Sequence, residues 1–587
     1  MNRTVLILAA FAALAACGKK EKAAAPAPQE TVKVAAPATP VLREFNLAAQ
    51  KDQFSYANVD EVKTTHVDLT LTVDFASKTL DGTAILDFVR VKPDADALIL
   101  DTDDLTIDTA EARIAGAWSP AVFVLGTDDP ALGAPLQISI PPGADAVRIG
   151  YRTSPEAQGL QWLTKEQTAG KRHPYMYSQN QAIHARSMAP LQDTPSIRIT
   201  YTAGIRTPEP LVAVMSAVRH EPEFDIQSFD MPQPIPSYLI ALAVGDIAFK
   251  AIDDQVGVWA EPEMLDAAVA EFSETPQMVA ANSALYGPYR WERYDMLVLP
   301  PSFPFGGMEN PRLTFLTPTA IAGDKSLTSL IAHELAHSWS GNLVTNATWR
   351  DSWLNEGVTS YVENRVVEAV FGPERAAMER ALDLEILKRD VAEAERPELT
   401  QLKLPADLKD PDEGFSQVAY VKGAFLLKFL EERFGREAFD QFLKAYFDKY
   451  AFKSVTTEDF VAEINALRAS KPDAVSDAEL REWINGQGVP ASVIVPQSDA
   501  FDRLAAGQQK WLAGSIKPQA LPTAAWTTQE WLRFINTLPE DIAPARLGEL
   551  DAAFKLSTAG NSEIAAAWYL RAVKAGYEPA LPEVEKF

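Results

Sequence analysis

Hydrophobic and polar residues alternate along the first third of the chain, beginning at His66. Val67, Leu69, Leu71 and Val73 are apolar and the residues between them are polar. This period of two is typical of a strand with one buried face. Residues 80–83 are expected to form a turn and residues 84–91 the next strand, and similar apolar runs follow near residues 99, 122–125, 147–151 and 197–201. We therefore expect a β-rich domain over residues 50–248.

From residue 249 onward the pattern becomes mixed. Residues 261–285 have helical spacing, residues 294–299 and 313–317 indicate buried strands, and residues 376–467 are mostly amphipathic helix. Thr456 or Thr457 is expected to cap a helix there. Gly486, Gly488 and Pro490 break the pattern. The chain is therefore predicted to be a multidomain α+β protein, with a mixed domain over residues 249–490 and an all-α domain over residues 498–587.

The amino terminus is predicted to be processed rather than folded. Residues 5–16 form an apolar run that is too short to span a bilayer, and Cys17 follows it directly. This junction resembles the lipobox of bacterial lipoproteins, which implies a signal peptide over residues 1–16 and a lipid on Cys17. The alternative is an ordinary secretory peptide with an incidental cysteine. Residues 17–49 are expected to form a flexible tether.

Charge and cysteine content narrow the classes of partner. The 587 residues include 54 Lys and Arg against 80 Asp and Glu, a formal net charge of −26. This acidity argues against nucleic acid or anionic lipid as a partner. Cys17 is the only cysteine, so no disulfide can form within the mature chain. Stability must then come from large cores, and the length suggests three or four domains.

One short motif carries strong chemical information. His333 and His337 stand four residues apart in a helical run, with Asp324 or Ser326 as the expected cap and Gly341 as the expected stop. This spacing puts two imidazoles on one helix face, where both can bind one zinc ion.

Glu334 and Glu356 complete the predicted centre. Glu334 lies beside the two histidines, where it can take a proton from water, and Glu356 on a second helix can supply the third zinc ligand. A bare motif of this kind arises by chance in roughly one chain in a hundred of this size. The following Asn355-Glu356-Gly357 makes chance an unlikely explanation. Glu363, seven residues after Glu356, is the candidate to orient a zinc-bound histidine.

The zinc motif, together with the string Gly306-Gly307-Met308-Glu309-Asn310, resembles the aminopeptidase N family of gluzincins. Residues 301–311, 323–327 and 177–184 resemble the leukotriene A4 hydrolase branch of that family. The resemblance covers residues from about 60 to 587. It implies a saddle-like β-rich domain, a thermolysin-like zinc catalytic domain and a C-terminal helical domain.

The same resemblance implies a role for each matching residue. It implies one Zn²⁺ at His333, His337 and Glu356, with Glu334 as general base and Tyr420 as the oxyanion-stabilising hydroxyl. It also implies that Glu309, helped by Gln181 and Gln179, binds the free amino terminus of a peptide. Gly306 and Gly307 let substrate backbone approach closely. Asp412 would line the pocket that holds the side chain of the first peptide residue. Phe415 takes the place of a second pocket residue, which is a tyrosine in the leukotriene A4 hydrolase branch. The C-terminal domain is expected to be incomplete at Phe587.

These features favour a zinc aminopeptidase that acts on peptides with a free amino terminus and prefers basic first residues. It is expected to be lipid-anchored through Cys17 in a bacterial extracytoplasmic space. The alternatives are a zinc-dependent epoxide hydrolase, bifunctional or not, and a non-catalytic binding lipoprotein. The intact Glu334 and the complete ligand set argue against the last of these.

Overall fold

The computed structural model describes residues 42, 43, 45, 47, 51–222 and 224–587. The predicted signal peptide over residues 1–16, Cys17 and most of the predicted tether lie outside this range. Among the described residues, no helix is both long and apolar enough to cross a membrane.

A large twisted sheet begins the fold, in the order β13-β14-β11-β1-β2-β8-β4-β5. Its strands are β1 (Val62–Asp74), β2 (Thr79–Arg90), β4 (Thr106–Ile114), β5 (Ala117–Pro120), β8 (Ala144–Arg152), β11 (Ile199–Arg206), β13 (Val218–Arg219) and β14 (Ile226–Ile235). The alternation predicted from Val67 onward appears in β1, whose apolar residues are buried. The prediction of a turn at residues 80–83 was wrong. The turn lies at residues 75–78, and Gly82 lies within β2, where a Cβ would fall 1.9 Å from the Thr70 carbonyl oxygen.

Two smaller sheets complete the N-terminal domain. One has the order β12-β15-β10-β9 and the other β3-β7-β6. Their strands are β3 (Ala97–Thr102), β6 (Phe123–Leu125), β7 (Ala134–Ser139), β9 (Leu160–Leu163), β10 (Tyr175–Ser178), β12 (Val212–Met215) and β15 (Leu242–Gly245), and the short helix α2 (Ala185–Met188) follows β10. The segment between β10 and α2 brings Gln181 to Glu309 and His184 to Asp412, both in the domain that the resemblance predicts to be catalytic.

A five-stranded mixed sheet, β16-β17-β18-β20-β19, forms one side of the catalytic domain. Its strands are β16 (Ala248–Ala251), β17 (Val256–Ala260), β18 (Tyr294–Val298), β19 (Gly307–Met308) and β20 (Leu313–Leu316). β19 is an edge strand that pairs only with β20 in this sheet. The helix predicted over residues 261–285 is two helices, α3 (Pro262–Glu271) and α4 (Thr275–Tyr286), because the chain turns at residues 272–274 and Pro276 starts a new helix.

Helices form the other side of the catalytic domain, together with the short strand pair β21 (Val344–Asn346) and β22 (Lys453–Val455). They are α5 (Thr328–Ala336), α6 (Trp353–Phe371), α7 (Pro373–Glu393), α8 (Gly423–Phe434), α9 (Arg436–Lys449), α10 (Thr457–Arg468) and α11 (Asp477–Asn485). Thr456 caps α10 as predicted. The predicted helical run over residues 376–467 is interrupted at residues 394–422 by short turns and by the π-helical segment η8 (Val418–Lys422).

The predicted ends of the zinc helix were also wrong. α5 begins after Leu327 without a side-chain cap and ends at Ala336, with His337 as its C-cap residue. Asp324 instead accepts a hydrogen bond from the Ser326 backbone N–H in the preceding loop. A tight turn, in which Gly341 has φ +94°, then leads to β21.

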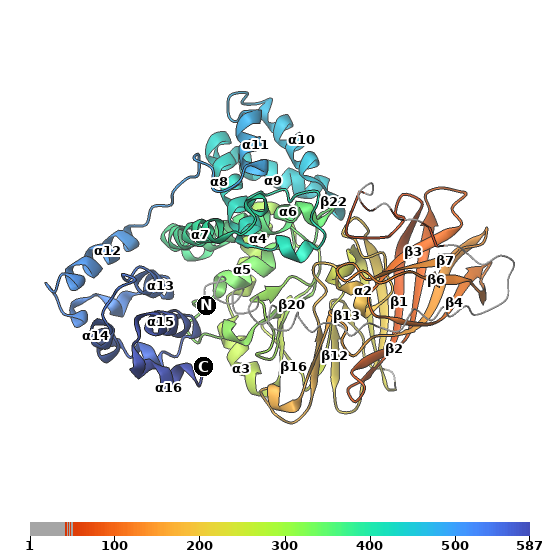
Figure 1. The fold of residues 1–587 in the computed structure, drawn as a ribbon, viewed down its shortest axis with the longest axis horizontal. Coiled ribbons are helices and arrows are strands. Elements are labelled where there is room, and N and C mark those ends of the chain that lie inside the picture. Colours follow the sequence, from red (N-terminus) through yellow and green to blue (C-terminus); the bar gives the residue numbers. More distant parts are fainter. Residues whose placement is uncertain (1–41, 44, 46, 48–50, 223) are drawn as a thin grey trace.

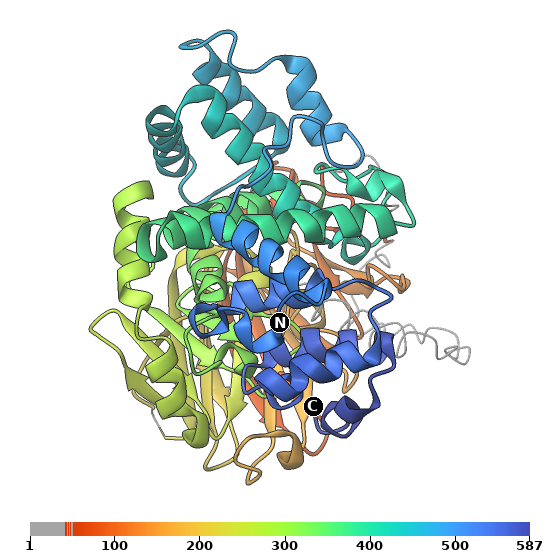
Figure 2. The same cartoon turned by 90° about the vertical axis from the view of Figure 1, so that its left-hand side faces the viewer.

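A separate helical domain follows an extended segment after α11 (Figures 1 and 2). It contains α12 (Asp499–Leu512), α13 (Thr528–Asn536), α14 (Pro544–Phe554), α15 (Ser562–Ala575) and α16 (Leu581–Val584), around a core of its own. The N-terminal and catalytic domains instead share one continuous hydrophobic core. The helical domain contacts the loop before α5, where Asn561 Nδ2 donates to Ser326 Oγ at 2.9 Å and to Asp324 Oδ2 at 3.2 Å.

Candidate active site

Three side chains from two helices meet at the end of α5. His333 lies in its last turn, His337 is its C-cap residue, and Glu356 lies in the first turn of α6. The Nε2 atoms of the two histidines are 3.1 Å apart. Glu356 Oε2 is 3.5 Å from His333 Nε2 and 3.4 Å from His337 Nε2. All three residues are buried, so the centre is shielded from bulk water.

This donor set fits one zinc ion. Ligand atoms of His333, His337 and Glu356 lie within 4.8 Å of one another. Glu356 Oε2 is buried and has no hydrogen-bond partner among the described residues, which is costly for a carboxylate unless a cation lies beside it. Two imidazoles and one carboxylate are a ligand set of catalytic zinc sites.

Neighbouring groups fix the orientation of both imidazole rings. Glu363 Oε2 lies 2.8 Å from His333 Nδ1, the contact expected from its position on α6. His337 Nδ1 lies 3.1 Å from the Ser340 carbonyl oxygen and 3.1 Å from Thr359 Oγ1. An Nδ1–H that donates to these oxygens leaves the Nε2 lone pair of each ring free to face the metal.

Glu334 is buried next to the centre and contacts the edge strand β19. Burial raises the pKa of its carboxyl to about 7, so Glu334 can both accept and release a proton near neutral pH. A Cβ on Gly307 would lie 2.4 Å from Glu334 Oε1. Glycine is therefore required at position 307 for the base to reach its position, in addition to the access for substrate that the sequence suggested.

Glu309 lies beside the zinc ligands in a polar cluster. Its Oε1 accepts from Asn355 Nδ2 at 3.2 Å and from Gln181 Nε2 at 3.4 Å. Burial raises the pKa of Glu309. A carboxylate oxygen of Glu309 lies within 4.8 Å of a carboxylate oxygen of Glu334 and of a ring nitrogen of His337. Of the two predicted glutamines, Gln181 makes the contact, whereas Gln179 Oε1 is buried without a partner in the described part of the chain.

The remaining predicted residues line the same region. The Tyr420 ring, in η8, stacks on His333 with ring centroids 5.9 Å apart. Asp412 Oδ2 lies 3.0 Å from His184 Nε2. Burial disfavours the charged form of His184, but the hydrogen bond and charge of Asp412 outweigh it and raise the pKa of His184 above its usual value. Phe415 packs against Trp349 with centroids 5.8 Å apart.

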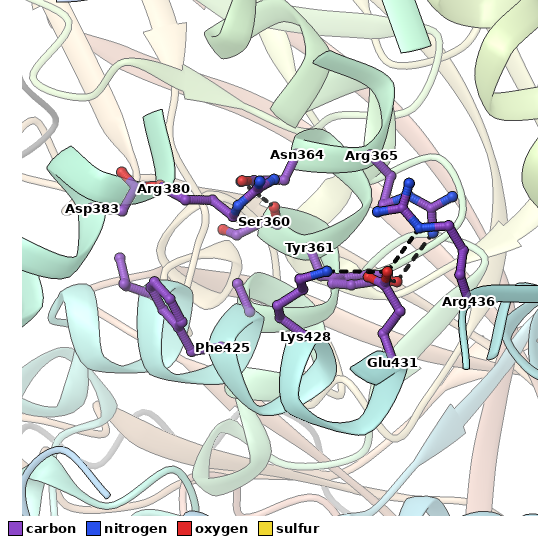
Figure 3. Close-up of a pocket in the computed structure, with 12 residues that line it drawn as sticks. Ser360, Tyr361, Asn364, Arg365, Arg380, Asp383, Phe425, Lys428, Glu431 and Arg436 are labelled. Atoms are coloured by element: carbon purple, nitrogen blue, oxygen red, sulfur yellow. Dashed lines mark hydrogen bonds and ion pairs between the residues drawn. The ribbon is translucent and has the colours of Figure 1, made fainter. Parts of the chain in front are cut away.

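The far side of α6 is anchored by charged groups (Figure 3). Tyr361 Oη donates to Glu431 Oε2 at 2.9 Å, and Lys428 and Arg436 also pair with Glu431. Arg365 pairs with Asp440. Tyr361 and Arg365 lie on the face of α6 opposite Glu356 and Glu363. This network therefore holds the helix that supplies one zinc ligand and one orienting acid.

Sequence reasoning gave no role to Asn355, Thr359, Asn342 or Tyr238. Asn342 Nδ2 donates to the Glu309 carbonyl oxygen at 2.7 Å, and Asn355 Nδ2 also reaches Tyr238 Oη at 3.3 Å. Asn355 could have been suspected because it directly precedes Glu356. Tyr238 comes from another domain, and nothing local in its sequence marks it.

Comparison with known proteins identifies the family. Residues 271–483 match the peptidase family M1 domain, residues 63–239 the peptidase M1 N-terminal domain, and residues 526–587 the leukotriene A4 hydrolase C-terminal domain. The chain is 38% identical to leukotriene A-4 hydrolase of Xenopus laevis over 558 residues, which cover 90% of each protein. The chain belongs to peptidase family M1.

Other M1 relatives agree with this assignment. Leucine aminopeptidase 2 of Yarrowia lipolytica is 36% identical, over 91% of this chain and 86% of the relative. The structure of yeast LTA4 hydrolase in complex with bestatin superposes with a TM-score of 0.84 at 31% identity, covering 90% of this chain and 88% of that one. The three-domain M1 fold, expected from the sequence, is thus confirmed. The M1 protein is a zinc metalloaminopeptidase of the leukotriene A4 hydrolase-like group, and the non-catalytic reading is set aside.

Proposed function

We propose that this M1 enzyme removes single residues from peptides with a free amino terminus, anchored by Glu309. The supporting observation is the buried Glu309 carboxylate beside Glu334 and His337. An ammonium group paired with Glu309 would bring the first peptide carbonyl close to the zinc ligands. A blocked terminus would leave the buried carboxylate unpaired, which disfavours acylated peptides.

In this reaction the residues of the site have separate roles. Glu309, Gln181 and Asn355 hold the ammonium group. Glu334 takes a proton from the attacking water and passes it to the leaving amine. Tyr420 donates its hydroxyl to the oxyanion.

His333, His337 and Glu356 would hold zinc, which when bound supplies Lewis-acid polarisation of the carbonyl and lowers the pKa of water. Around it, the free edge of β19 offers backbone groups for an extended substrate to pair with as an added strand. Such pairing contacts the main chain of the peptide, so it selects only weakly among the side chains that follow the first residue.

We further propose that the pocket for the first side chain prefers arginine and lysine. Asp412 supports this, because a carboxylate can pair with guanidinium through two hydrogen bonds. Its side chain is 44% exposed and pairs with His184, so the charge that it offers depends on the proton of His184. The names of two relatives favour leucine instead. Turnover of arginyl and leucyl amides decides between the two preferences.

Epoxide hydrolysis is a second candidate. The Xenopus relative is named leukotriene A-4 hydrolase, and Asp412 is the residue that the resemblance links to epoxide opening. Product analysis after incubation with an allylic epoxide fatty acid tests this candidate. Enzymatic formation of a diol that is lost in Asp412→Asn supports this candidate. Hydrolysis of the epoxide no faster with the enzyme than without it contradicts this candidate.

The experiment for the main proposal measures zinc content and turnover together. One zinc per chain is expected, with hydrolysis of an aminoacyl p-nitroanilide and at least about a hundredfold slower hydrolysis of its N-acetyl analogue. Chelation should abolish turnover and added zinc should restore it. Equal cleavage of free and acetylated amides would contradict the role of Glu309 while leaving the zinc assignment intact.

A further inference from the structure

A pocket outside the zinc site lies between the N-terminal domain and the catalytic sheet. It has a volume of about 220 Å³. One side of it is lined by residues of β12, β13 and the loop between them. The other side is lined by residues of β16, β17, β18 and β20 and by residues next to these strands. The labelled strands β12, β13, β16 and β20 lie close together in Figure 1. The zinc ligands and Glu334 do not line it. The proposed peptidase reaction therefore gives this pocket no role.

Three guanidinium groups line this pocket, those of Arg219, Arg293 and Arg312. Arg293 pairs with Asp295, the one acidic lining residue, at 2.8 Å. Arg312 pairs at 2.8 Å with Glu292, whose side chain is 67% exposed. Arg219 has no ion pair among the described residues. The lining thus holds three cations and one carboxylate, in a chain whose formal net charge is −26. This local excess of positive charge would attract an anion.

Two of these guanidinium groups also have unused hydrogen-bond donors. The Nε atoms of Arg219 and Arg312 are buried and have no acceptor in the described part of the chain. Arg312 is only 5% exposed, and its Nη2 reaches Glu292 and, at 3.5 Å, Gln233. Arg219 donates through Nη2 to Gln227 at 3.2 Å. Buried donors without acceptors are rare, and they show that these two guanidinium groups are incompletely paired within the described chain. A carboxylate that enters the pocket would form charge-assisted hydrogen bonds with the guanidinium N–H groups that line it.

The backbone at Arg312 adopts an uncommon conformation. Arg312 has φ +68°, a left-handed conformation that is unfavourable for a residue with a Cβ. Such conformations persist where the surrounding structure enforces them, and they concentrate at binding and active sites. Here the conformation accompanies a guanidinium buried at the pocket.

The remaining wall of the pocket is apolar. Phe249 and Trp259 contact each other with ring centroids 4.7 Å apart, and Met215 and Leu313 also line the pocket. The Arg219 guanidinium lies 6.0 Å from the Trp259 ring centroid, and that of Arg293 lies 5.6 Å from the Phe249 centroid. An apolar wall with a few convergent charged groups is typical of a small-molecule site.

We propose that this pocket binds a small monocarboxylate with an aromatic or apolar body. The planar carboxylate matches the guanidinium fork and neutralises the surplus charge, and the body packs against Trp259 and Phe249. A dianion such as phosphate fits less well, because Asp295 and Glu292 already offset two of the three cations. This site is independent of the proposed peptidase reaction.

The test uses calorimetric titration of the zinc-loaded full chain with phenylacetate and with its neutral analogue phenylacetamide. Phenylacetate is expected to bind at least about tenfold more tightly than the amide. Arg219→Gln should weaken phenylacetate binding at least about tenfold, and Arg219→Lys should restore part of it. Arg172→Gln is the matched control, because Arg172 is a half-exposed arginine outside the pocket that pairs with Asp246. It should bind like wild type.

Phenylacetate could also bind at the zinc site, and that binding would persist in Arg219→Gln. The binding that is lost in this variant is therefore binding at the pocket. Arg312→Gln provides a second disruption, with folding checked by thermal melting. The proposal is overturned if phenylacetate and phenylacetamide bind equally, or if Arg219→Gln and Arg312→Gln both bind phenylacetate like wild type. It is also overturned if inorganic phosphate competes with phenylacetate and binds more tightly than phenylacetate does.

Discussion

At the scale of single residues, the centre depends on which nitrogen each histidine presents. Glu363 fixes His333, and Ser340 with Thr359 fixes His337, so both Nε2 atoms face Glu356. The spacing of His333, His337 and Glu356 was enough to predict that these three side chains meet. Glu363 was predictable because it lies two helical turns after Glu356 on the same face. Thr359 and Ser340 were not, because their contacts depend on the turn after α5.

Glu334→Gln is expected to keep zinc and lose peptidase activity. The amide has nearly the same shape but cannot accept a proton, and loss of a general base typically costs about 10²–10⁴-fold in rate. Zinc analysis and kcat on an aminoacyl amide check this. A variant with near wild-type kcat would remove Glu334 from the mechanism.

Glu363→Gln is expected to weaken zinc binding by about 10–100-fold, because the His333 ring loses its charged partner. Competition with a chromogenic chelator measures the affinity. Glu368→Gln, on the same helix but paired with Arg436, is the control and should leave zinc affinity unchanged. Equal affinities in both variants would assign Glu363 a purely structural role.

The preference for arginine over leucine is expected to rise with pH. The pKa of His184 is raised, so below that pKa its imidazolium offsets the charge of Asp412. Above it, His184 is neutral and Asp412 offers its full charge to the substrate. The ratio of kcat/KM values should increase by up to about fivefold, the range of a partly exposed ion pair.

Measuring the ratio from about pH 6 to about pH 9 spans the titration of a histidine with a raised pKa. Asp412→Asn should flatten this pH dependence, and His184→Gln should hold the ratio high throughout. A wild-type preference for leucine at every pH would show that Asp412 does not set specificity.

At the scale of elements, β19 contacts Glu334, the proposed base, and borders the proposed path of the substrate. Much of the secondary structure followed from periodicity, including β1 and α10. The wrong predictions of turns and helix ends arose at glycines, which occur in more than one kind of local structure. Gly82 suggested a turn but permits close strand pairing, and Gly341 suggested a helix end but forms a turn five residues after the last residue of α5. Local sequence does not distinguish these uses, because the deciding contact comes from a distant part of the chain.

Gly307→Ala is expected to reduce kcat by about 10²-fold while zinc stays bound. The new methyl group would displace Glu334, and misplacing a catalytic group by about 1 Å has an effect of this size. Gly306→Ala should be milder, because its Cβ would meet only the end of the flexible Leu330 side chain. Gly560→Ala, with no heavy atom of the described chain within 4 Å, is the neutral control. Equal kinetics in all three variants would contradict the contact with Glu334.

At the scale of the whole molecule, we propose that the enzyme is tethered to a bacterial membrane and faces an extracytoplasmic space. The lipobox-like sequence around Cys17 supports this. Cys17→Ser is expected to release the protein into the soluble fraction with unchanged specific activity, because the tether separates the anchor from the fold. Fractionation with immunodetection measures the distribution. Retention of the variant in membranes would argue against a lipid on Cys17.

The contacts of Glu309 with residues of two domains have a thermodynamic consequence. Gln181 belongs to the N-terminal domain, whereas Glu309 and Asn355 belong to the catalytic domain, and all three face the proposed position of the substrate ammonium. Ligand binding and domain docking are therefore linked equilibria. A ligand at a hundred times its dissociation constant favours the docked form by about 2.7 kcal/mol, so a peptide bound at Glu309 protects the shared core from opening.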